Sequence, residues 1–117
     1  MKLAELKHIP YHIRQAGVSK EPLVRQNLIL GYQINEVTKE RNCSLKKIAN
    51  WIGMIHPRVC QIVNMLLLSP KIQEEILFSE DKALFSIPEY KLRDVTAEID
   101  WNKQQALWNK LLKSQQN

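Results

Sequence analysis

The fold is predicted by one stretch of the chain, residues 44–68, with the sequence SLKKIANWIGMIHPRVCQIVNMLLL. Its first part carries apolar residues at helical spacing, and Ser44 stands where an N-cap would accept a hydrogen bond from a free amide of the first turn. Gly53 follows, where a helix can end in a left-handed conformation that glycine adopts at low cost. Pro57 suits the first turn of a second helix, because its missing N–H has no partner there. The stretch predicts two short helices joined by a tight turn, the pattern of a helix-turn-helix.

The spacing of the small and apolar residues supports this register. Ala49 is the small residue where the two helices would cross closely, and Gly53 follows four positions later in the turn. Val59 and Ile62 would anchor the second helix against the first. The alternative is an ordinary helical hairpin inside an all-α domain. The remaining apolar positions of the pair are Leu45, Ile48, Ile52, Val63, Leu66 and Leu67.

Length and composition fit one globular domain. The chain has 117 residues, of which 44% are hydrophobic and 25% charged, which argues against a disordered chain. The longest apolar run, residues 65–68, is too short to span a membrane, and no leader with a cleavage site opens the chain. We therefore expect a cytoplasmic, nucleoid-associated protein. Cys43 and Cys60 show no metal-binding spacing, so we expect two reduced thiols.

The placement of charge is more informative than the net charge of +5. Residues 1–42 carry seven Lys or Arg against four Asp or Glu, and residues 69–117 carry seven against eight. Residues 43–68 hold three basic residues and no acid. The predicted helix pair therefore lies in a segment without carboxylates, as a surface that meets phosphates requires.

The rest of the chain predicts supporting helices. Residues 1–18 would be an N-terminal arm that either contacts DNA or is a frayed or partner-docking segment. Residues 19–113 would be a single helical domain and residues 114–117 a tail. A helix capped by Ser19 would run to about Glu40, with Pro22 in its first turn and Gly31 allowing close packing. Its apolar stripe is Leu23, Leu28, Leu30, Ile34 and Val37.

Three further helices are expected after residue 68. One begins at Ser69-Pro70, with Ile72, Ile76 and Leu77 facing inward. Another begins at the capping box formed by Ser86 and Glu89 and runs to Val95. Asp100 would cap the last helix, residues 101–113, in which Trp101 and Trp108 share a face that is either core or a dimer seam. The whole chain predicts an all-α fold, a helix-turn-helix embedded in a compact bundle of about six to seven helices.

In a helix-turn-helix the second helix enters the major groove of double-stranded DNA. The side chains predicted to face base edges are His56, Arg58, Gln61 and Asn64, in the helix 56–67. Arg58 can pair with guanine and Gln61 or Asn64 with adenine, and Arg58 can instead grip a phosphate. The phosphate contacts expected from the first helix are Ser44, Lys46 and Lys47, the alternative for the two lysines being a solvated face. Trp51 is expected to pack against a neighbouring helix.

Catalysis finds almost no support, and we expect no enzyme activity and no cofactor. The chain has no glycine-rich phosphate loop and no HExxH motif. We expect no cysteine or carboxylate at ligand spacing from His8, His12 or His56. His8 and His12 are four residues apart, but Pro10 between them disfavours a regular helix. We therefore expect no metal site.

Residues 44–77 resemble the DNA-binding part of the ParB/KorB-like family of bacterial partition and plasmid-control proteins. The resemblance lies in the segments SLKKIANWIG, HPRVCQIVNMLLL and SPKIQEEIL. The chain is also similar to short ParB-like proteins of mobile elements and phages, which have counterparts of its ending from Asp100-Trp101 to Trp108. The 117 residues hold no counterpart of the family's nucleotide-binding domain, so the resemblance implies DNA binding and neither CTP binding nor clamp sliding. Ile55 stands where the family has a small polar cap, which leaves His56 as the expected N-cap.

The sequence therefore predicts a sequence-specific double-stranded DNA-binding protein, a transcriptional regulator or an accessory factor of a mobile-element recombination or partition system. A homodimer would double the contacts with DNA. The alternative is a protein-interaction module that docks a recombinase through the helix bearing Trp101 and Trp108. Binding of single strands or RNA would need exposed aromatic residues among the basic ones, and the basic segment offers only Trp51.

Overall fold

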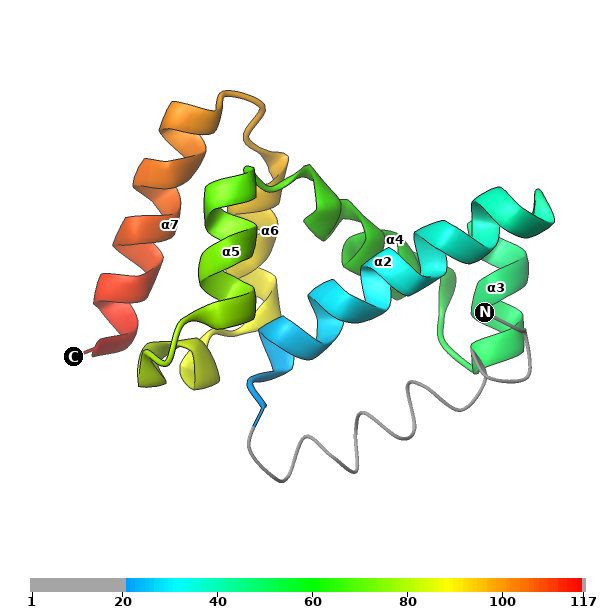
Figure 1. Ribbon diagram of the computed structural model, residues 1–117, viewed down its shortest axis with the longest axis horizontal. Coiled ribbons are helices and arrows are strands. Elements are labelled where there is room, and N and C mark those ends of the chain that lie inside the picture. Colours follow the sequence, from blue (N-terminus) through cyan, green and yellow to red (C-terminus); the bar gives the residue numbers. More distant parts are fainter. Residues whose placement is uncertain (1–20, 117) are drawn as a thin grey trace.

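The computed structural model describes residues 21–116, and these form helices and connecting turns without a strand (Figure 1). The expected all-α fold is confirmed. Over the same residues, no helix is both long enough and apolar enough to cross a membrane. The α-helices are α2 (Leu23–Arg41), α3 (Leu45–Ile52), α4 (His56–Asn64), α5 (Pro70–Phe78), α6 (Glu89–Ala97) and α7 (Trp101–Gln116), and the 3-10 helices are η1 (Met65–Leu67) and η2 (Lys82–Ser86).

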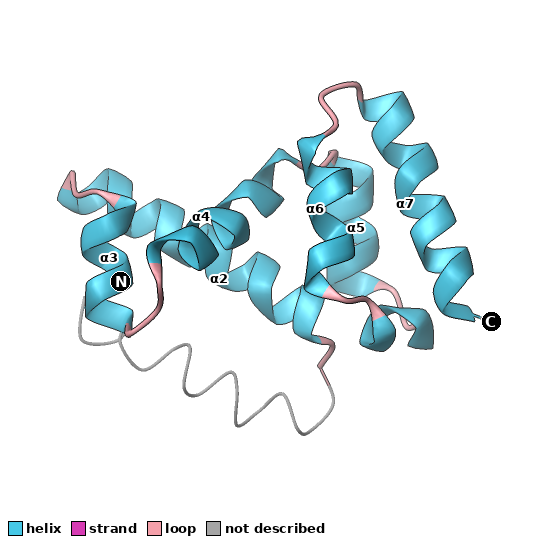
Figure 2. Ribbon diagram, turned by 180° about the vertical axis from the view of Figure 1, so that it is seen from behind, coloured by secondary structure: helices cyan, strands magenta, loops and turns pink. Residues whose placement is uncertain are grey.

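Helix α2 connects the two halves of the molecule. Figures 1 and 2 show α3 at the C-terminal end of this helix, α4 across its middle, and α5, α6 and α7 toward its N-terminal end. Leu30, Ile34 and Val37 bury their side chains in a helix-turn-helix core, whereas Val24 and Leu28 belong to a C-terminal core. The helix-turn-helix core also holds Ile48, Ala49, Ile52, Val59 and Ile62, and the C-terminal core holds Met65, Leu68, Ile72, Ile76, Leu84, Ile87, Leu92, Val95, Trp108 and Leu111.

The local signals of residues 44–62 are confirmed. The Ser44 hydroxyl accepts a hydrogen bond from the Lys47 amide at 3.1 Å and caps α3. Gly53 ends that helix with φ of 73°, in the left-handed region where a Cβ is strained. Ala49, Val59 and Ile62 are buried between the helices. The sequence therefore encodes this helix–turn–helix unit through contacts that are close in sequence.

Close packing of α2 on α4 depends on Gly31. A Cβ built on this residue would lie 2.8 Å from the backbone oxygen of Ile62. Real Cβ atoms do not approach a carbonyl so closely, so any larger residue would push α4 away from α2. The expected packing role of Gly31 is confirmed.

Three expected helix starts are wrong. Pro22 is the N-cap of α2 instead of lying in its first turn, and Ser19 lies outside the described residues. Ser86 ends η2 and caps nothing, because Ile87 precedes a proline and stays extended, and Pro88 becomes the N-cap of α6. His56 is the first residue of α4. Its N-cap is Ile55, whose carbonyl accepts from the amides of residues 58 and 59.

The C-terminal ends of α4 and α7 also differ from expectation. The second helix of the unit stops at Asn64 and gives way to η1, so it does not run to Leu67, which is 61% exposed. Helix α7 continues to Gln116, past the expected tail boundary. The caps at Ser69, which accepts from the Ile72 amide, and at Asp100, which accepts from the Asn102 amide, are as expected. Leu23 is exposed because it stands at the first turn of α2, outside the C-terminal core.

The two tryptophans of α7 do not share one environment. Trp108 is fully buried in the C-terminal core, and its indole N–H donates to a carboxylate oxygen of Glu75 at 2.5 Å. Trp101 is 55% exposed at the start of the helix. The expectation of core packing is confirmed for Trp108. Of the two tryptophans, only Trp101 is exposed, so only its ring could take part in a dimer seam.

Candidate nucleic-acid interface

The first turn of α3 presents basic side chains around free backbone amides. Lys46 and Lys47 are exposed, Ser44 caps the helix, and this turn holds no acidic residue. The ammonium of Lys47 lies 5.3 Å from the centre of the Trp51 ring, a cation–π arrangement. Trp51 itself is half-buried against the helix-turn-helix core, as expected. This turn can therefore offer amides and cations to one anion at the same time.

Helix α4 carries the side chains expected to face base edges, and the structure places them on two of its sides. His56 and Asn64 are exposed, and Gln61 is half-buried. The Cys60 sulfur lies 3.3 Å from His56 Nε2, so the expectation that no histidine has a cysteine at ligand spacing is wrong. Positions four residues apart share one face of a helix. His56, Cys60 and Asn64 therefore lie along one face of α4, with the half-buried Gln61 next to Cys60.

Arg58 is not an unpaired cation. Its Nη1 and Nη2 donate to the two carboxylate oxygens of Glu89 at 2.5 and 2.9 Å. The segment 43–68 lacks acids in sequence, but Glu89 at the first position of α6 supplies one in space. Arg58 would have to leave this pair before its guanidinium could read a guanine.

Glu89 is held by more than one donor. Asn27 Nδ2 on α2 donates to Glu89 Oε1 at 2.7 Å. The hydrogen bonds from Arg58 are the largest cause that lowers the pKa of Glu89 below its ordinary value of 4.5, against the opposing effect of partial burial. Asn27 and the charge of Arg93 lower this pKa further. The carboxylate is therefore ionised at neutral pH and joins α2, α4 and α6.

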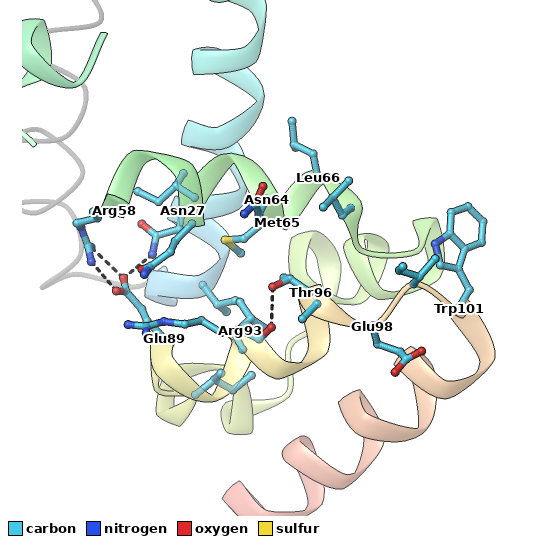
Figure 3. A pocket seen from close by; sticks show the side chains of 18 residues that line it. Asn27, Arg58, Asn64, Met65, Leu66, Glu89, Arg93, Thr96, Glu98 and Trp101 are labelled. Carbon is cyan, nitrogen blue, oxygen red and sulfur yellow. Dashed lines mark hydrogen bonds and ion pairs between the residues drawn. The ribbon is translucent and has the colours of Figure 1, made fainter. Parts of the chain in front are cut away.

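A groove adjoins this carboxylate, with a cavity volume of about 590 Å³. Its walls come from α4 and η1 on one side and from α6 and the start of α7 on the other (Figure 3). Arg58 and Glu89 lie at one end and Trp101 at the other. Most of the lining is apolar, and Gln61 and Asn64 also contribute to it. The groove therefore runs along one side of the helix expected to meet DNA.

Sequence reasoning missed Glu89, Asn27 and the groove. Glu89 lies 31 residues from Arg58 and 62 residues from Asn27 along the sequence. A local sequence pattern does not indicate contacts between residues so far apart. In the sequence, Glu89 is marked only as an acid at the start of a predicted helix, where it fits a capping box with Ser86. The groove depends on how α6 is placed against α4, which periodicity does not reveal.

The described residues show no metal cluster of three or more His, Cys, Asp or Glu side chains. Cys43 and Cys60 are free thiols. His8, His12 and the whole expected N-terminal arm lie outside the described residues. Comparison with known proteins finds no family model, curated protein or solved structure that matches the chain.

Proposed function

We propose that this protein binds double-stranded DNA in a sequence-specific manner, with α4 in the major groove. The observation that carries the proposal is the glycine-turn pair α3–α4, supported by α2, with exposed polar side chains on α4. A helix of this kind presents its early residues to base edges while the preceding helix crosses the backbone. The resemblance of residues 44–77 to ParB/KorB-like DNA-binding segments supports the same proposal.

The base-reading side chains in this proposal are Gln61 and Asn64, with His56 beside them. A side-chain amide can donate to and accept from adenine at the same time, which gives discrimination of about 1–3 kcal/mol for each good pair. Arg58 has a structural role in the free protein. Because Glu89 holds both of its terminal nitrogens, Arg58 positions α4 in the free protein and reads a base only after leaving that carboxylate.

Contacts with the DNA backbone are assigned to the first turn of α3. Lys46 and Lys47 supply charge, and the amides near Ser44 supply donors to a phosphate oxygen. Such contacts fix the orientation of a protein on the duplex without reading its sequence. They also make the affinity fall steeply as salt rises, because bound counterions are released.

The cellular role proposed with this activity is that of a transcriptional regulator or an accessory factor in mobile-element recombination or partition, acting on the nucleoid in the cytoplasm without catalysis. A homodimer would engage two half-sites and double the contacts. The alternative, docking of a recombinase through the tryptophan face of α7, has less support, because Trp108 is buried and only Trp101 is exposed.

Selection from a random duplex library tests the proposal. We expect recovery of a defined sequence, with a palindrome if the protein binds as a dimer. Affinity for the recovered duplex, measured by fluorescence anisotropy, should fall steeply between two salt concentrations. Equal binding to all duplexes would contradict sequence-specific reading, and an affinity that does not respond to salt would point to an apolar protein interface instead.

A further inference from the structure

The groove beside α4 has the dimensions and the chemistry of a small-molecule site. Pockets that enclose organic ligands have volumes of about 300–1,000 Å³ and mostly apolar walls with a few polar groups, and this groove holds about 590 Å³. Met65 and Leu92 contribute buried apolar surface to its lining. Leu67, Ile99 and Trp101 contribute exposed apolar surface, and Ile99 is 92% exposed.

The polar groups gather at one end of the groove. Figure 3 shows the Arg93 side chain extending toward the end where Arg58 meets Glu89. At this end of the groove two guanidinium groups therefore face one carboxylate. The other carboxylate of the lining, Glu98, lies toward Trp101, so the excess of positive charge is confined to the Arg93 end. The Glu89 oxygens are already occupied by Arg58 and Asn27. No side chain among residues 21–116 forms a hydrogen bond or ion pair with the exposed Arg93 guanidinium.

We propose that this groove binds a small, water-soluble amphiphile that carries one carboxylate on an apolar chain or ring system. The carboxylate pairs with Arg93, whose planar fork matches the two oxygens of such a group. The apolar body lies along the groove toward Leu67, Ile99 and Trp101, where it covers side chains that are otherwise in water. A cationic head group is disfavoured at this end because Glu89 is already paired there and Arg93 would repel a second positive charge; Glu98 lies at the other end, beside the place of the apolar body.

The test compares three probes with the same ten-carbon chain, namely decanoate, decanol and decylamine. Isothermal titration of the DNA-free protein below the micelle concentration should give one saturable site for decanoate. A hydrogen-bonded charge pair is expected to make decanoate bind roughly tenfold more tightly than decanol. Decylamine, which is cationic at neutral pH, should bind more weakly than decanoate, because Arg93 repels its ammonium and Glu89 is already paired.

Two variants and a control assign the site. Arg93→Gln should bring the decanoate-to-decanol affinity ratio close to one, while Lys91→Gln, on α6 but outside the groove lining, should leave it unchanged. Ala97→Phe adds a ring at an exposed position of the lining and should remove binding of all three probes, with unchanged circular dichroism. Because no DNA is present, a failure of the proposed DNA binding does not affect this result.

The proposal is overturned if decanoate shows no saturable binding to the wild-type protein. It is also overturned if decanol binds as tightly as decanoate, or if Arg93→Gln keeps the preference for the carboxylate. Binding that survives Ala97→Phe would place the probe elsewhere on the molecule and would contradict the assignment to this groove.

Discussion

Arg58 on α4 and Glu89 on α6 form a two-pronged ion pair, in which both terminal nitrogens of the guanidinium meet both oxygens of the carboxylate. Each side chain is about one-third exposed. A pair of this geometry fixes orientation as well as charge. It therefore holds α4 and α6 on opposite sides of the groove and connects the helix-turn-helix core with the C-terminal core.

Replacing the carboxylate tests this connection. Glu89→Gln removes the charge but keeps the size, and we expect the free energy of unfolding to fall by about 1 kcal/mol at neutral pH, since the pair is partly exposed. The pKa of Glu89 is lowered in the folded protein, so its contribution is present above its ordinary value of 4.5 and is lost as pH falls through the folded value. Denaturant unfolding over a pH series should show the gap between wild type and variant closing below pH 4.5.

Glu98→Gln is the matched control. Glu98 also lines the groove, and its Oε1 accepts only from the Asp100 amide among the described contacts, which a glutamine oxygen can do equally well. We expect a change within about 0.5 kcal/mol. A gap between wild type and Glu89→Gln that stays constant over the acidic range would mean that the ion pair contributes no stability.

Alanine and asparagine should destabilise the protein in opposite order at Gly31 and at Gly53. Gly31→Ala forces a Cβ against the Ile62 carbonyl, and we expect a loss of about 1–2 kcal/mol despite the better helix propensity of alanine. Gly31→Asn should cost more. At Gly53, where φ is 73° and the space is open, asparagine should cost less than alanine. Thermal unfolding of the four variants checks this, and the same ranking at both positions would refute the assigned causes.

Replacing either tryptophan of α7 by alanine should lower the free energy of unfolding by very different amounts. Trp108→Ala removes a fully buried ring and its hydrogen bond to Glu75, at a cost of about 3–5 kcal/mol. Trp101→Ala should change the free energy of unfolding by about 0.5 kcal/mol or less. Denaturant unfolding of both variants measures the difference. Equal losses would mean that Trp101 is also covered, for example in a dimer.

The helix caps could be predicted from the sequence because their partners are close by. The Ser44 and Ser69 hydroxyls each accept from the amide three residues on, so a single residue type at one position carries the signal. Gly53 is equally local, since its φ is a property of one residue. The apolar spacing of α2, α3 and α4 likewise predicted which side chains are buried in the helix-turn-helix core.

The contacts between distant segments could not be predicted. The fully buried Gln104 accepts from the Ser69 amide and donates to the Leu67 and Glu98 carbonyls, yet nothing in the sequence of α7 marks it as a core residue. The partner of Arg58 was missed for the same reason. At Pro22, Ile55 and Pro88 the first turn is closed by a backbone carbonyl and by no side-chain cap, so the residue types that signal a cap do not locate these three helix starts.

Lys46 provides a prediction for the DNA backbone. Lys46→Gln should weaken binding to all duplexes by a similar factor and reduce the salt slope of log affinity by about 1, as expected for one phosphate contact. Lys71→Gln, an exposed lysine on α5, should leave both quantities unchanged. Fluorescence anisotropy at several salt concentrations measures the slopes. A larger loss on the recovered sequence than on random duplexes would assign Lys46 to base reading instead.

One pair of double variants shows whether α4 reads the base sequence. Gln61→Ala/Asn64→Ala removes the two amides from α4, and Gln105→Ala/Asn109→Ala removes the same two residue types from α7, where they bond to each other. On the duplex recovered by selection, anisotropy should show a loss of roughly tenfold or more for the α4 variant and none for the α7 variant. Equal affinities of the two variants for this duplex would contradict the assignment of α4 as the reading helix.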